Sequence, residues 1–225
     1  PAWRQWMERW PDPAALAGAA TGEVLRVWGG LGYPRRALRL MECARTVVER
    51  HGGRLPCDLE ALRALPGIGD YTAGAVMAFA YGRRALTLDT NVRRVLARAV
   101  GGRALPPPSL GRAERERAEA LLPEADGEAA AWSVAVMELG ALVCTAREPR
   151  CGRCPAAGMP PDEHAGRRRR QAWHGTDRQA RGLIMARLRG IDAGTALDAQ
   201  TLLDAAGGAG ARGGRTADRG QPSRA

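Results

Sequence analysis

The sequence of 225 residues contains no lysine, one phenylalanine and three tyrosines. Because large aromatic residues are few while alanine, leucine and valine are abundant, the composition favours helices over sheets. No run of apolar residues approaches the length of about 18 that a membrane-spanning helix requires. The first ten residues, "PAWRQWMERW", are charged and lack the apolar segment of a secretory signal peptide. We therefore expect a cytoplasmic protein with no membrane partner.

Because lysine is absent, all 34 basic residues are arginine, and with 24 acidic residues they give a net charge of +10. One explanation is a genome whose base composition favours arginine codons. The other is a polyanionic partner, of which nucleic acid is the simplest. The length allows one large domain or two small ones, each with a buried core. In a reducing compartment the five cysteines are thiols or metal ligands rather than disulfides.

Helical periodicity dominates the chain and predicts an all-α protein. The expected helices cover residues 3–10, 23–28, 35–51, 59–65, 70–81, 91–100, 112–122, 127–143, 177–188 and 195–205. The stretch "RRALTL" is expected to be an extended link. The sequence indicates four regions: residues 1–99 as one lobe, 100–165 as a second lobe that ends in a cysteine-rich loop, 166–206 as a basic linker with a short helical extension, and 207–225 as a disordered tail.

The most informative stretch is "LPGIGDYTAGAV", residues 65–76. It predicts two short helices joined by a hairpin in which Gly67 and Gly69 can take positive φ. The backbone N–H groups of such a hairpin suit a phosphate and need no side chain. A tight turn between two helices uses glycine in the same way. The pattern therefore leaves DNA binding and a plain turn open, and the basic charge favours DNA.

Two further patterns carry possible chemistry. In "LTLDTNVRRVLARA", Asp89 precedes a helix, where it is either a capping residue or a catalytic carboxylate. Cys144, Cys151 and Cys154 have the spacing C-x6-C-x2-C, and a fourth cysteine five residues further on would complete an iron–sulfur motif. Pro160 occupies that position. A cluster, a zinc site completed by His164 and three unliganded thiols all remain open.

Several segments occur in an order that is similar to a known family: "VWGGLGYPRRALRL", "HGGRLP", "LPGIGDYTAGAV", "LDTNVRRVLAR", "MELGALVC" and the cysteine run. The chain resembles the helix-hairpin-helix DNA glycosylases, and most closely the MutY-type adenine DNA glycosylases. The resemblance implies two helical lobes that flank a DNA-binding cleft. It further implies a monomeric, nucleoid-associated enzyme of base excision repair. The partner would be double-stranded DNA with a mismatched or oxidised base, from which adenine opposite 8-oxoguanine or guanine is removed.

The resemblance also assigns roles to individual residues. Asp89 matches the catalytic aspartate, and Asn91 matches a residue that orients water and this aspartate. Tyr71 stands where endonuclease III relatives have a catalytic lysine, and since a tyrosine forms no Schiff base, a monofunctional glycosylase is expected. Tyr33 matches a residue that wedges beside the mismatched base. The expected DNA contacts are Tyr33, Leu65, Gly67, Ile68, Gly69 and Thr72.

The chain departs from the family pattern in two places. The family's 4Fe–4S cluster would be held by Cys144, Cys151 and Cys154, but Pro160 cannot bind iron, and Asp162 or His164 would have to replace the fourth cysteine. The helix motif E-V-x-L-Q-Q-T, whose glutamate protonates the leaving adenine, is missing. We therefore expect an N-terminally truncated chain with impaired catalysis. A thymine or uracil mismatch glycosylase and a non-catalytic DNA-binding remnant are the alternative interpretations.

Overall fold

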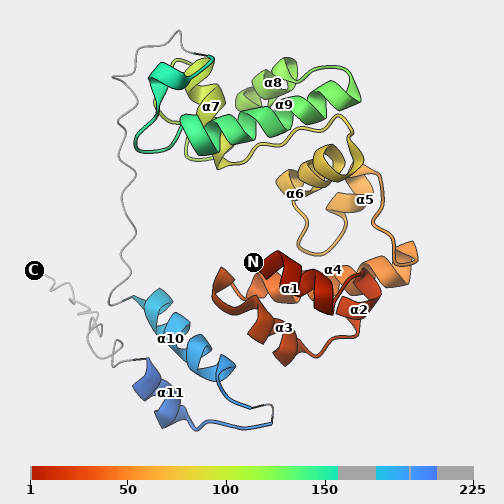
Figure 1. The fold of residues 1–225 in the computed structure, drawn as a ribbon, viewed down its shortest axis with the longest axis vertical. Coiled ribbons are helices and arrows are strands. Elements are labelled where there is room, and N and C mark those ends of the chain that lie inside the picture. Colours follow the sequence, from red (N-terminus) through yellow and green to blue (C-terminus); the bar gives the residue numbers. More distant parts are fainter. Residues whose placement is uncertain (1, 157–175, 193, 207–225) are drawn as a thin grey trace, which may run out of the picture. The chain divides into compact units, whose positions relative to one another are not determined.

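The computed structural model describes residues 2–156, 176–192 and 194–206, and within these ranges every regular element is helical (Figure 1). The expectation of an all-α protein is therefore confirmed. None of the described helices is long and apolar enough to cross a membrane. The chain divides into two compact units. The described residues of the first are 3–19 and 35–156, and those of the second are 20–34, 176–192 and 194–206. The division between residues 99 and 100 falls inside the first unit and stays a prediction.

The first unit begins with three helices: α1 (Ala2–Arg9), α2 (Pro13–Ala17) and α4 (Arg35–His51). The short helix α2 packs along α4 and was not predicted. Its local signals are strong, however. The Asp12 side chain accepts a hydrogen bond of 2.8 Å from the Ala15 N–H, and Pro13 follows at the first helical position. An aspartate cap followed by proline is a typical helix start, so periodicity fails here only because the helix is so short.

The helices α5 (Leu59–Arg63) and α6 (Asp70–Ala75) pack against α4 through a small apolar core. Its members are almost fully buried and come from all three helices and from the turn between α5 and α6: Cys43, Val47, Leu62, Leu65 and Ala73. Burial of such side chains stabilises the fold by roughly 1.5–3 kcal/mol for each large one. This core therefore fixes the hairpin at residues 65–69 relative to α4.

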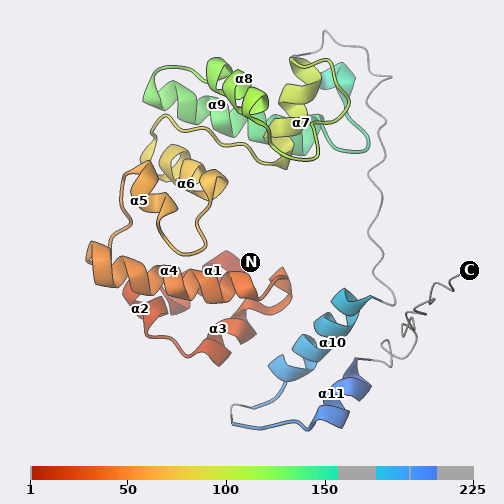
Figure 2. The same cartoon turned by 180° about the vertical axis from the view of Figure 1, so that it is seen from behind.

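The remaining helices of the first unit are α7 (Thr90–Ala99), α8 (Arg112–Leu121) and α9 (Asp126–Glu138), which lie side by side in both views (Figures 1 and 2). Two helices end in a π-helical turn: α6 runs into η2 (Val76–Ala80) and α9 into η3 (Leu139–Val143). The extents of these two helices match the predicted 70–81 and 127–143. The wider turns were not predicted, because a π turn changes the helical period only locally.

The extended link from Gly82 to Leu88 is held by Arg84. Its backbone N–H donates to Asp126 Oδ1 at 2.7 Å, and its Nη1 donates to Glu119 Oε1 at 2.6 Å. Its Nε donates to the Pro123 carbonyl at 2.9 Å. One residue thus joins the end of α8 to the start of α9, which sets the position from which the chain enters α7.

The second unit combines α3 (Thr21–Trp28) and the 3-10 turn η1 (Gly29–Leu31) with α10 (Asp177–Arg189) and α11 (Ala199–Ala205). α10 packs on α11. The Thr176 side chain caps α10 by accepting a hydrogen bond from the Gln179 N–H at 3.3 Å. The predictions for the linker at 166–175 and for the tail at 207–225 lie outside the described residues.

Candidate functional site

Asp89 is the capping residue of α7. Its Oδ1 accepts a hydrogen bond of 2.7 Å from the Val92 N–H, and its Oδ2 accepts one of 3.1 Å from Asn91 Nδ2. The cap proposed from the sequence is therefore present. A carboxylate has about four acceptor positions, so two hydrogen bonds leave each oxygen with further capacity. These hydrogen bonds fix the orientation of the Asp89 carboxylate and leave acceptor positions for another partner.

Asn91 connects Asp89 to the interior. Arg94 is 5% exposed, and its Nη2 donates to Asn91 Oδ1 at 2.9 Å and to the Gly140 carbonyl at 2.5 Å. Its Nε donates to the Cys144 carbonyl at 2.7 Å. A continuous chain of hydrogen bonds therefore runs from Asp89 to the backbone of residues 140–144. Sequence reasoning missed Arg94, although an arginine on the apolar side of α7 was a visible signal, because a buried charge requires partners.

Gly140 lets this contact form. A Cβ atom at Gly140 would lie 2.8 Å from the Asn91 Cβ and 3.0 Å from the Asn91 carbonyl oxygen. Such separations are too short for carbon and oxygen atoms that are not bonded. The π turn η3 and the start of α7 therefore approach each other only because position 140 has no side chain.

Tyr71 on α6 lies within electrostatic reach of Asp89. Burial raises the pKa of the Tyr71 phenol, and the negative charge of Asp89 raises this pKa further. Both causes disfavour the phenolate. At neutral pH Tyr71 is therefore a neutral hydrogen-bond donor beside the Asp89 carboxylate. Three predicted catalytic residues, Tyr71, Asp89 and Asn91, thus belong to one neighbourhood of the first unit.

The hairpin between α5 and α6 is closed by a hydrogen bond of 3.1 Å from the Ile68 N–H to the Leu65 carbonyl. Gly67 has φ +79°, as expected, and a Cβ there would lie 2.8 Å from the Arg39 Cβ. Gly69 has φ −102°, so the expectation of a positive φ is wrong for it. Its extended backbone leads the chain directly into α6. Leu65 is only 3% exposed, and its N–H donates to the Leu62 carbonyl at 3.1 Å, so Leu65 supports the hairpin from inside.

Charged side chains surround the start of α6. The Asp70 carboxylate lies 3.0 Å from Arg63 Nε and 2.9 Å from Arg115 Nη2. Arg63 precedes the hairpin, whereas Arg115 comes from α8, so Asp70 joins two parts of the first unit. Thr72, which was predicted to contact DNA, is half-buried on the next turn. The carboxylate holds two guanidinium groups beside the hairpin.

Tyr33 belongs to the second unit. It has φ +48° and is the one non-glycine residue with positive φ in the described part of the chain. The Trp28 indole N–H donates to the Gly32 carbonyl at 2.8 Å and closes the turn before it. Tyr33 is 68% exposed. The backbone therefore holds an aromatic ring in contact with solvent.

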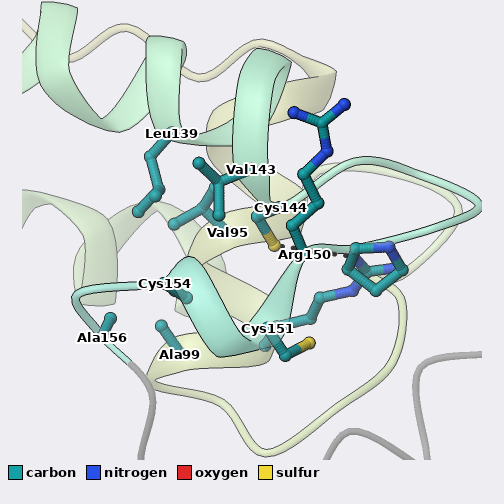
Figure 3. A pocket seen from close by; sticks show the side chains of 11 residues that line it. Val95, Ala99, Leu139, Val143, Cys144, Arg150, Cys151, Cys154 and Ala156 are labelled. Carbon is teal, nitrogen blue, oxygen red and sulfur yellow. Dashed lines mark hydrogen bonds between the residues drawn. The ribbon is translucent and has the colours of Figure 1, made fainter.

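The three cysteines of the C-x6-C-x2-C pattern line one pocket of about 40 Å³ (Figure 3). Cys144 follows η3, and Cys151 begins the 3-10 turn η4 (Cys151–Arg153), after which Cys154 follows. Arg98, which is 3% exposed, donates from Nη1 to Cys144 Sγ at 3.5 Å and to the Thr145 carbonyl at 2.8 Å. A buried arginine of α7 thus anchors the start of the cysteine loop.

The three described cysteines share a pocket without converging as a metal-binding group. In residues 2–156, 176–192 and 194–206, no group of three or more cysteine, histidine, aspartate or glutamate side chains is arranged to hold a metal ion. Pro160, Asp162 and His164 lie outside the described residues. A 4Fe–4S cluster needs four ligands around one centre, and the donor groups described here do not supply them.

Comparison with known proteins agrees with this geometry. Residues 1–120 match the family model of the HhH-GPD superfamily base excision DNA repair protein. The adenine DNA glycosylase of Mycobacterium tuberculosis is 52% identical in an alignment of 198 positions that covers 84% of this chain and 64% of the relative. The human adenine DNA glycosylase is 42% identical in an alignment of 157 positions that covers 68% of this chain and 28% of the relative. The chain thus spans less than two thirds of these relatives.

Smaller glycosylases match over more of their own length. The thymine-DNA glycosylase of Aeropyrum pernix is 36% identical over 155 residues, which are 68% of this chain and 70% of the relative. The structure of a thermostable thymine-DNA glycosylase matches with a TM-score of 0.60 and 28% identity over 69% of this chain and 71% of that one. A non-covalent endonuclease III–DNA complex matches with a TM-score of 0.62 and 23% identity over 72% and 74%, which supports the fold alone. Since the family model covers more than half of its residues, this chain belongs to the HhH-GPD superfamily of base excision DNA repair proteins.

Proposed function

We propose that this protein is a monofunctional DNA N-glycosylase that hydrolyses the N-glycosidic bond of adenine mispaired with 8-oxoguanine or guanine. The observation that carries the proposal is the Asp89 carboxylate, fixed by Val92 and Asn91, with a neutral tyrosine beside it where a lyase would need an amine. The adenine specificity is supported by the identity of 52% to the mycobacterial adenine DNA glycosylase.

Asp89 supplies negative charge to the sugar. When the bond between C1′ and the base breaks, positive charge develops on the deoxyribose ring, as in other glycoside hydrolyses. A carboxylate that is already oriented stabilises this charge without having to reorganise during the reaction. The hydrogen bonds from Val92 and Asn91 hold Asp89 in this way. Water then adds its hydroxyl to C1′, a proton from water balances the departing base, and the products are the free base and an abasic site.

Tyr71 restricts the reaction to hydrolysis. Strand cleavage by a lyase begins with a Schiff base between C1′ and an amine, and a phenol cannot form one. A tyrosine phenol is protonated at neutral pH, and the raised pKa of Tyr71 favours this form further, so Tyr71 can donate a hydrogen bond in the neighbourhood of Asp89. The abasic site is therefore released with its strand intact.

Double-stranded DNA with a mispaired or oxidised base is the proposed partner, bound by a monomer. The hairpin would meet a phosphate through the backbone N–H groups of Gly67 and Gly69, with Thr72 further along α6. The N–H groups of Leu65 and Ile68 donate to the Leu62 and Leu65 carbonyls and hold the hairpin in shape. The net charge of +10 supports this partner, since neutralised phosphates release counterions. Tyr33 would stack beside the mispair, and its exposed ring is compatible with that role.

A thymine or uracil mismatch glycosylase is the second candidate. The match with the thymine-DNA glycosylase of Aeropyrum pernix covers 70% of that relative, whereas the match with the adenine DNA glycosylase of Mycobacterium tuberculosis covers 64%. A DNA-binding protein without catalysis is the third. It would bind the mismatch but release no base.

Single-turnover excision separates these candidates. Duplexes that contain A opposite 8-oxoguanine, T opposite G or U opposite G are incubated with the chain, alone and with a helix bearing E-V-x-L-Q-Q-T fused before Pro1. We expect release of adenine only. Release of thymine or uracil would establish the second candidate, and binding without release from either protein would establish the third.

The 4Fe–4S cluster expected from the resemblance has no part in this chemistry as proposed here. The cysteine loop is held by Arg94 and Arg98, both of which donate to its backbone. Iron and sulfide analysis of the purified protein tests the expectation directly. A stoichiometric cluster would show that a fourth ligand completes the pocket.

A further inference from the structure

The loop that carries Tyr33 is held in an uncommon conformation. Gly29 and Gly32 have φ values of +51° and +78°, which suit glycine, and Tyr33 follows at φ +48°. A positive φ costs a tyrosine free energy, so the surrounding structure must hold it there. One contact that does so is the hydrogen bond from the Trp28 indole to the Gly32 carbonyl. The ring itself remains 68% exposed.

A second contact reaches the ring from a distant part of the sequence. The guanidinium carbon of Arg178 lies over the Tyr33 ring, 6.0 Å from its centroid. Arg178 is the second residue of α10, and the Thr176 cap orders this first helical turn. A guanidinium over an aromatic face, within about 6 Å of the ring centroid, is attracted to the electrons of the ring. The helical extension thus contributes a side chain to the Tyr33 loop.

We propose that Arg178 is a positioning residue for Tyr33: its guanidinium covers one face of the ring and presents the other face to an unpaired base of DNA. The inference rests on the proposed function, because it takes Tyr33 as the residue that stacks beside the mispair. A ring with a cation on one face and a base on the other forms a three-layer stack. The extension that contains α10 is then part of mismatch recognition.

General attraction to phosphate must be separated from this positioning. Arg181 and Arg187 are also exposed on α10 and carry the same charge. The cation over the Tyr33 ring, however, is that of Arg178. Loss of a charge at Arg181 should weaken binding to paired and mispaired DNA equally, since phosphates are the same in both. Loss of Arg178 should additionally reduce the preference for the mispair.

The test uses the full chain and measures dissociation constants by fluorescence anisotropy. The two probes are a duplex with one A opposite 8-oxoguanine and the same duplex with C opposite 8-oxoguanine. We expect Arg178→Ala to lower the preference for the mispair about two- to fivefold, the range for an exposed cation–ring contact. Arg178→Lys should retain part of the preference for the mispair. Arg181→Ala should leave the preference unchanged.

A double-mutant cycle with Tyr33→Ala decides whether Arg178 acts through the ring. In the Tyr33→Ala background, Arg178→Ala should have no further effect on the preference. An undiminished effect there, or equal effects of Arg178→Ala and Arg181→Ala, would overturn the proposal. If Tyr33→Ala abolishes the preference but Arg178→Ala does not change it, only the role of Arg178 fails. If the unmodified chain shows no preference for the mispair, the role of Arg178 and the proposed function fail together.

Discussion

Helices α7 and α6 begin in opposite ways. At α7, the Val92 N–H at the start of the helix donates to the Asp89 carboxylate. The Asn91 side chain donates to Asp89 as well, and Arg94 donates to Asn91. At α6, Gly69 stands in the capping position and offers no side-chain acceptor. The N-terminus of α7 is therefore capped by the protein itself, a closed start. The N-terminus of α6 has no side-chain cap and can donate to an acceptor outside the protein, an open start.

The difference corresponds to two tasks. A carboxylate that must keep one orientation needs a closed network, and a surface that must receive a phosphate needs unsatisfied donors. An open start alone does not distinguish α6, because α8 has Gly111 in its capping position and also lacks a side-chain cap. What distinguishes α6 is the charge beside it, since Asp70 holds Arg63 and Arg115 at the hairpin. The following predictions test both starts.

Removal of the Arg94 side chain should have the largest effect on stability, because it breaks the buried hydrogen bonds that support the start of α7. Arg94→Met would leave the Gly140 and Cys144 carbonyls without their buried donor. We expect a loss of about 3–5 kcal/mol in the free energy of unfolding, measured by urea denaturation. Arg112→Met is the control, since the Arg112 side chain is 91% exposed. Equal midpoints for the two variants would show that the Arg94 network contributes little.

Asp89→Asn should come next, because it keeps the cap and removes the charge. Asparagine is as good a cap as aspartate, so the unfolding midpoint should change little. In the protein with the fused E-V-x-L-Q-Q-T helix, single-turnover excision should fall by about 10²–10³-fold, as expected when a fixed electrostatic group is lost from an active site. Asp58→Asn is the matched control: Asp58 caps α5 by accepting from Ala61 at 2.8 Å. Retained activity in Asp89→Asn would reduce Asp89 to a structural cap.

At the open start, Gly67→Ala and Gly69→Ala form a matched pair. Alanine at 67 would have positive φ and its Cβ would collide with Arg39, whereas at 69 nothing lies within 4 Å of the new Cβ. We expect Gly67→Ala to cost about 1–3 kcal/mol of stability and to weaken binding to duplex DNA. Gly69→Ala should change the stability little. If both variants bind DNA like the unmodified chain, the hairpin is only a turn.

Asp70→Asn should strengthen binding to DNA. The change removes a negative charge beside the hairpin and releases Arg115 for phosphate, whereas Arg63 keeps its ion pair with Glu60. We expect about two- to fivefold tighter binding at low salt, the effect of one exposed charge. The salt dependence should also become steeper, by up to about one in the slope of log K against log salt. Weaker binding would mean that the carboxylate is needed to position the two arginines.

The smallest effect concerns Tyr71, which lies on α6 and senses Asp89 on α7. Its folded pKa is raised, so the stability it contributes is complete below the unfolded pKa of 10.0 and is lost as the pH rises through the folded value. Asp89→Asn should lower the pKa of Tyr71 but leave it raised, because burial is the larger cause. Ultraviolet titration of the phenolate measures this shift, with Tyr71→Phe identifying the signal. An unchanged pKa of Tyr71 in Asp89→Asn would show that the two residues do not interact electrostatically.

Most of the helices could be predicted, because their apolar residues recur with the helical period and glycines or prolines end them. The helix at 35–51 was predicted with its observed bounds. The Asp89 cap was open to prediction too, since it depends on residues three positions apart. These features arise from local sequence.

The remaining features depend on contacts between distant segments. The position of Arg94 on the apolar side of α7 indicates burial, but its partners at residues 140–144 are about 50 positions away and follow only from the fold. The contact between Arg178 and Tyr33 joins opposite ends of the sequence. The cysteine spacing could suggest a metal site, but spacing along the chain does not determine whether the thiols converge. Such features follow from tertiary packing rather than from local propensity.

The close approach of Gly140 to Asn91 has a genetic consequence. Every glycine codon begins with two guanines, and a single-base change at either position yields a stop codon or a residue that has a Cβ atom. At position 140 any such atom would collide with Asn91. This codon therefore lacks a conservative missense neighbour, and a single guanine-to-thymine transversion in it should disturb the α7 start directly. In a mutational scan of the gene, position 140 should tolerate fewer substitutions than the exposed Gly127, where nothing lies within 4 Å of an added Cβ.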